Sequence, residues 1–119
     1  MHKMTQAEFN ALKRNEIGYL VIPDCTDCTE IDFGAANRVI FGNWCKLGVG
    51  CKLGVGCKLG VGCVLGNGCV MGCNCELGCG CELGCDCELG DWCKLGSWCK
   101  LRGGCKLGIG CVLGDNGEK

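Results

Sequence analysis

The chain has 119 residues, enough for one small domain, and 17 of them are cysteine and 23 are glycine. Its formal net charge of −1 gives no basic surface for nucleic acid, and its longest apolar run, residues 19–22, is too short to span a bilayer. Residues 1–4 lack the apolar core of a secretory signal. We therefore expect a cytoplasmic protein with no nucleic-acid or membrane partner.

Residues 1–30 contain no repeat and are predicted to form an N-terminal cap. Thr5 and Glu8 have the spacing of a capping box, which predicts a short helix over about residues 6–14. The apolar run that follows predicts a strand over about residues 18–23, ending at Pro23. A solenoid needs such a cap, because its end otherwise exposes apolar side chains and unpaired strand edges.

Residues 31–117 carry a six-residue repeat, and residues 118–119 form a short tail. From Cys45 to Cys111 a cysteine recurs every six residues, followed two positions later by Leu or Met and then by Gly, with Arg102 as the one exception. In the unit of residues 51–56, Cys-Lys-Leu alternates as a short strand with Lys outside, and Gly-Val-Gly forms a corner. Strands with one common inward pattern are predicted to wind as a parallel coil. Residues 31–33 and 39–41 are predicted to be two earlier strands of it.

Residues 53–58, Leu-Gly-Val-Gly-Cys-Lys, resemble the hexapeptide-repeat family at every position. The resemblance covers about residues 31–117. It implies an all-β fold, a left-handed parallel β-helix with three faces, 18 residues per coil and about 4.7 coils. The charges agree with this period, because a step of 18 places Glu76, Glu82 and Glu88 beside Lys94, Lys100 and Lys106.

The regular cysteines are interpreted as reduced, buried thiols, because neighbours in a ladder lie too far apart for an unstrained disulfide. Cys25 and Cys28 form a CxxC and are the best metal candidates. Two ligands are fewer than structural zinc requires, so no metal and no cofactor are expected. Cys73, Cys79 and Cys85 are expected at three different corners, where they cannot converge on one ion.

Many proteins of the hexapeptide-repeat family are acyltransferases that use a histidine and loops extruded from the coil. Here the single histidine, His2, lies outside the repeat, and no insertion interrupts residues 39–117. No catalytic residue is therefore assigned and a non-catalytic protein is predicted. A degenerate acyltransferase-like protein is an alternative.

Protein contacts are predicted at the corners and at the C-terminal end. Trp44 and Trp98 fall on one edge and Trp92 on the next, either as partner-binding residues or as rings that cover their own corners. Ile109, Val112 and Leu113 are expected to form an uncapped apolar end that joins two copies as a homodimer. The alternative is a frayed last coil screened by residues 115–119.

The near-identical cysteine hexads also resemble short hexapeptide proteins encoded by phages and prophages. That resemblance implies an inhibitor that binds a host protein in the host cytoplasm, such as a defence protein. A structural or accessory virion protein is the alternative. The sequence does not identify the partner.

Overall fold

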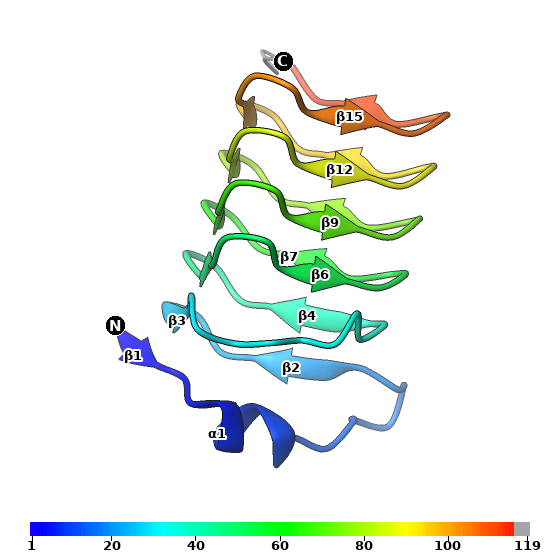
Figure 1. Ribbon diagram of the computed structural model, residues 1–119. Coiled ribbons are helices and arrows are strands. Elements are labelled where there is room, and N and C mark those ends of the chain that lie inside the picture. The colour runs from blue at the N-terminus through cyan, green and yellow to red at the C-terminus, as the bar shows by residue number, and fades with distance from the viewer. Residues whose placement is uncertain (116–119) are drawn as a thin grey trace.

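The computed structural model describes residues 1–115, which form a parallel β-solenoid of about five turns (Figure 1). The strands are stacked as short rungs from the N-terminal end at the bottom of the view to the C-terminal end at the top. This confirms the all-β parallel β-helix that the repeat predicts. The predicted tail, residues 118–119, and residues 116–117 lie outside the described residues.

Three parallel sheets form the faces of the solenoid, and we name them faces A, B and C. Face A contains β1 (His2–Lys3), β3 (Thr26–Cys28), β5 (Lys46–Leu47), β8 (Val64–Leu65), β11 (Glu82–Leu83) and β14 (Lys100–Leu101). Face B contains β2 (Leu20–Ile22), β4 (Val39–Phe41), β7 (Lys58–Leu59), β10 (Glu76–Leu77), β13 (Lys94–Leu95) and β16 (Val112–Leu113). Face C contains β6 (Lys52–Leu53), β9 (Val70–Met71), β12 (Glu88–Leu89) and β15 (Lys106–Leu107). The chain visits the faces in the order B, A, C, so its corners form three edges, which we call B–A, A–C and C–B.

The register confirms a period of 18 residues in the regular part of the rod. Glu76 pairs with Lys94 above it and with Lys58 below it. Glu82 and Glu88 pair in the same way with lysines one coil higher, at positions 100 and 106. Opposite charges therefore stack up each face, as the sequence predicts.

The inward positions form one continuous core. From Cys45 to Leu101 every Cys of the six-residue period and every Leu or Met two positions after it is buried. The glycine that follows each Leu is fixed by close packing: a Cβ on Gly78 would lie 2.8 Å from the carbonyl carbon of Gly60, one coil below. Coils at this spacing leave no room for a side chain at that position.

The buried thiols are hydrogen-bonded as well as packed. From Cys63 to Cys111, each thiol of the period donates to the carbonyl oxygen of the glycine 21 residues earlier, at 3.1–3.3 Å. These carbonyls belong to the glycines packed under the next coil. Cysteine is thus both a small apolar residue and a weak donor to a buried corner carbonyl.

The N-terminal segment differs in detail from the prediction. The helix α1 spans Gln6–Asn10 and not 6–14, because the chain turns at Ala11 so that Leu12 packs on the core and Arg14 donates to the carbonyl of Asn37. The strand β2 is shorter than 18–23, since Gly18 lies in a turn at φ 87°. Tertiary contacts outweigh the weak helix propensity of so short a segment.

The stacked strands begin before residue 31, because β2 and β3 pair in parallel with β4 and β5. This first coil is one residue longer than the others: Leu20 pairs with Val39, a step of 19. Residues 31–33, predicted as a strand, form no ladder with β6, although Ile31 and Phe33 point into the core. Corners of irregular length on both sides offset this segment, so face C begins at β6.

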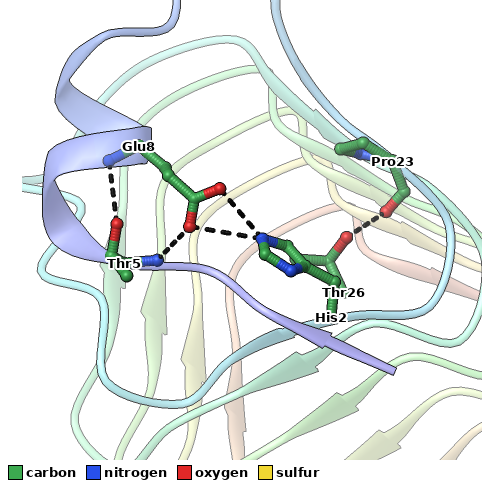
Figure 2. A network of polar contacts seen from close by, with 5 residues as sticks. All are labelled: His2, Thr5, Glu8, Pro23 and Thr26. Atoms are coloured by element: carbon green, nitrogen blue, oxygen red, sulfur yellow. Dashed lines mark hydrogen bonds and ion pairs between the residues drawn. The ribbon is translucent and has the colours of Figure 1, made fainter.

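The cap closes the lower end of the solenoid with aromatic packing and a polar network. Phe9 of α1 meets Phe33 edge to face at 5.1 Å, and Phe33 meets Phe41 of β4 at 5.4 Å, which continues the core into the cap. The capping box is present: Glu8 N donates to Thr5 Oγ1 and Thr5 N donates to Glu8 (Figure 2). These contacts confirm the sequence motif and fix the start of α1.

Candidate functional site

The corners place several bulky residues in a backbone conformation that favours glycine. The second corner residue has a positive φ in every regular corner described. It is glycine in most of them but Trp in three, with φ of 63° at Trp44, 62° at Trp92 and 65° at Trp98. Large side chains rarely adopt this conformation, which costs about 1–2 kcal/mol relative to glycine. Three such residues in one rod indicate that the rings gain something in return.

Two of the tryptophan rings lie over a glycine of the next coil. The ring of Trp44 covers Gly62, and the ring of Trp92 covers Gly110, each 18 residues later. More than half of each tryptophan nevertheless remains exposed, at 58% for Trp44 and 60% for Trp92. The rings therefore cover backbone with one face and present the other face to solvent.

The structure places the tryptophans on the edges that the sequence predicts. Trp44 and Trp98 lie on the B–A edge, three coils apart, and Trp92 lies on the C–B edge. Val61, half-exposed, and Cys79, exposed, lie between Trp44 and Trp98 on the B–A edge. This edge is thus a narrow row of apolar side chains, without a cavity built around it in the described residues.

The described C-terminal coil is less well covered than the coils below it. Leu107 and Leu113 are only partly buried, whereas Leu95 and Leu101 are 3% and 5% exposed. Ile109 and Val112 are exposed, and β14, β15 and β16 are the last strands of their sheets. Within residues 1–115, this end presents apolar side chains together with the upper edges of three strands.

Cys25 and Cys28, the candidate metal ligands, do not face a common point. Cys25 is exposed in a corner at φ 55°, whereas Cys28 is fully buried in the core of β3. Burial raises the pKa of the Cys28 thiol to about 12, so it is a protonated core residue at neutral pH. Among residues 1–115 no group of three His, Cys, Asp or Glu side chains is arranged to hold a metal ion.

The corner cysteines lie on separate edges: Cys73 on C–B, Cys79 on B–A and Cys85 on A–C. Cys79 is exposed and the other two are half-buried. All 17 cysteines are free thiols in the structure.

The single histidine is part of the cap. His2 Nε2 lies 2.9 Å from Glu8 Oε2, beside the network of Thr5, and the His2 side chain is 63% exposed (Figure 2). The pKa of Glu8 is lowered, first by the backbone N–H of Thr5 and then by His2. His2 lines none of the three largest cavities described for residues 1–115.

Two features near the cap were not expected from the sequence. A cavity of about 510 Å³ lies under β6, where residues 29–35 leave the ladder. A second cavity, of about 440 Å³, is lined by Arg14 and Arg38. The signal for the second was present in the sequence, because Arg38 occupies the corner position that most other corners fill with glycine.

Comparison with known proteins agrees with the repeat. Residues 68–103 match the family model described as bacterial transferase hexapeptide (six repeats). Neither the curated proteins nor the solved structures gave a match to the chain. Within residues 1–115 no helix has the length and apolar content needed to cross a membrane.

The matched segment lies in the middle of the rod, and the same strands, corners and register continue below it to β4 and above it to β16. The geometry of the matched coils is therefore that of the whole regular stack. The chain is a hexapeptide-repeat β-helix protein.

Proposed function

We propose that this chain is a non-catalytic protein-binding solenoid that pairs with a second copy of itself through its C-terminal coil. The observation that carries the proposal is the change in burial along the rod. Leucines of the lower coils are 0–5% exposed, whereas Leu107 and Leu113 are partly open, next to exposed Ile109 and Val112.

A second copy suits this end for a geometric reason. Each of the strands β14, β15 and β16 presents an upper edge of backbone N–H and C=O groups. A two-fold axis at the end of the rod brings an identical apolar surface and identical strand edges against them, so that one patch serves both partners. The cap of α1 and β1 occupies the opposite end, which leaves the C-terminal end for pairing.

The test is the molar mass in solution, measured by light scattering on the full chain at micromolar concentration. We expect a dimer for the wild type and a monomer for Ile109→Glu and Leu113→Glu. Val49→Glu is the matched control, because Val49 is an exposed valine on the A–C edge of a low coil, and this variant should remain a dimer.

A monomeric wild type overturns the proposal, and so does dimerisation that survives both C-terminal substitutions. Circular dichroism of each variant separates loss of pairing from loss of folding. Val112→Lys, at an outward position, provides a further variant whose folded core is unchanged.

The finer proposal is that the rod is a phage-encoded inhibitor of a host protein, and it rests on the resemblance of the cysteine hexads to phage and prophage proteins. The exposed faces of Trp44 and Trp98 are the surface we assign to that partner. The test is whether the pure chain binds one defined host protein and lowers its activity, and whether Trp98→Gly abolishes both effects. Binding that Trp98→Gly leaves intact contradicts the assignment, and so does binding without inhibition.

A further inference from the structure

We propose that Arg14 and Arg38 form a binding site for the phosphate group of a small soluble molecule, on the C–B edge beside the cap. The site is independent of end-to-end pairing, because it lies at the opposite end of the rod. It consists of the cavity of about 440 Å³ that is lined by Arg14, Gly18, Asn37, Arg38 and Val55.

The first observation is that two guanidinium groups converge on the same point. Arg14 Nη1 donates to the carbonyl oxygen of Gly18 at 2.8 Å and to that of Asn37 at 3.0 Å. Arg38 Nη1 lies 3.8 Å from the position that a Cβ on Gly18 would occupy. Both positive charges therefore border one cavity, next to the backbone of Gly18.

The second observation is that nothing described neutralises them. The cavity lining holds no carboxylate, and within residues 1–115 neither arginine forms an ion pair with an acidic side chain, Glu16 of the same loop included. Two cations held close together repel each other, and an anion between them converts that repulsion into attraction. The local charge thus calls for an anionic ligand.

The third observation is that the donors are held in place. Arg14 uses only Nη1 for the backbone carbonyls, so its Nε and Nη2 donors stay available. The stem of Arg38 rests over Gly56, where a Cβ would lie 3.5 Å from Arg38 Cγ. Arg38 also sits at φ 54°, a conformation that disfavours a long side chain. A strained position held against its own preference is typical of a functional residue.

The chemistry of the ligand follows from the donors. Guanidinium forks bind the tetrahedral oxygens of phosphate through paired hydrogen bonds, and two forks at one cavity suit a dianion better than a single carboxylate. Lys58, 5.6 Å above the ring of Tyr19, adds a third positive charge near Gly18. The half-exposed Val55 supplies an apolar wall for the rest of the molecule.

The test is a nuclear magnetic resonance titration of the full chain with inorganic phosphate, pyrophosphate and acetate at constant ionic strength. We expect saturable shifts at the backbone amides of Gly18, Asn37 and Arg38, with pyrophosphate binding more tightly than phosphate and acetate most weakly. Shifts that stay linear with concentration, or that spread evenly over the lysines of all faces, overturn the site. Acetate binding as tightly as phosphate overturns the choice of ligand.

Three variants make the test specific. Arg38→Gly removes one guanidinium and relieves the strained backbone, so the fold is kept and phosphate affinity should fall at least tenfold. Arg14→Gln keeps a donor for the two carbonyls and should also fall at least tenfold. Arg102→Ala is the control, because Arg102 is an exposed arginine 3.8 Å from Glu82 in a distant coil, and its loss changes the net charge equally. Equal affinity in Arg38→Gly and Arg102→Ala contradicts the proposal.

Discussion

The ring of Trp44 lies directly against Gly62, its neighbour one coil higher. Gly62 has φ +71°, so two separate features oppose a side chain there: the backbone conformation and the ring. Gly68 has the same φ of +71° but nothing within 4 Å of its would-be Cβ. The pair separates the two effects.

We predict that Gly62→Ala destabilises the protein more than Gly68→Ala. Both variants lose about 1 kcal/mol to the backbone, and Gly62→Ala loses a further 1–3 kcal/mol, roughly, because the methyl group displaces the ring. Urea unfolding measures both free energies. In the double variant Trp44→Gly with Gly62→Ala the extra loss should vanish, and equal destabilisation of the two single variants would show that the ring makes no firm contact.

The glycine after each leucine should be intolerant to substitution for a different reason. A Cβ on Gly78 would lie 2.8 Å from backbone of the coil below, so Gly78→Ala must push two coils apart, at a cost of about 1–3 kcal/mol or more. Gly103 has no atom within 4 Å and no positive φ, so Gly103→Ala should be neutral or slightly stabilising. The midpoint of thermal unfolding compares them, and a neutral Gly78→Ala would contradict the close packing.

The thiol ladder predicts a clear difference between buried and corner cysteines. Cys81 donates to the carbonyl oxygen of Gly60 at 3.2 Å and is fully buried. Cys81→Ala removes the thiol and leaves that carbonyl without this donor, which should cost about 1–3 kcal/mol.

Cys79→Ala, two residues away on the exposed B–A edge, is the control and should change the free energy of unfolding by less than about 0.5 kcal/mol. If both cysteines prove equally dispensable, the hydrogen bond adds nothing to the packing.

The cap should weaken in acid. Because the folded-state pKa of Glu8 is lowered from its ordinary value of 4.5, its contribution is complete above that value and is lost as the pH falls through the lower folded-state pKa. Amide exchange in α1 should therefore accelerate below about pH 4.5, before exchange in β10 or β11 does. In Glu8→Gln the acceleration between pH 5 and pH 3 should disappear, and an unchanged pH profile in that variant would assign the effect to another group.

The regular part of the fold was predictable because one six-residue unit contains the whole instruction. The alternation in Cys-Lys-Leu sets which side chains point inward, and the charges of Glu76 and Lys94 set the number of residues per coil. Both were correct from β4 to β16. The capping box at Thr5 was also correct, since it depends only on residues three apart.

The first coil was predicted less well because its geometry depends on contacts distant in sequence. Leu20 and Asp27 do not show the repeat, yet they pair with Val39 and Lys46 as full rungs. Residues 31–33 have the inward pattern but lie out of step with β6, a consequence of corner lengths that no local pattern reveals. The meeting of Arg14 and Arg38 follows from the same tertiary arrangement and was likewise invisible in the sequence.

The tryptophan positions were predicted but their contacts were not. Counting by 18 placed Trp44 and Trp98 on one edge, whereas the direction in which a ring turns depends on the backbone angle of its corner. The sequence offered two alternatives, partner binding or cover for the backbone, and the structure gives Trp44 and Trp92 the geometry for both.

Because three hexads complete one circuit, insertions and deletions act on this protein like frameshifts with a structural codon. Loss of a single hexad keeps every cysteine in the core but rotates all later residues by one face, which would carry Trp98 away from the line of Trp44 and set lysine above lysine elsewhere. Loss of three hexads shortens the rod and restores the alignment. Natural length variants of this chain are therefore expected to differ by multiples of 18 residues where the surface matters, and by multiples of six where only folding does.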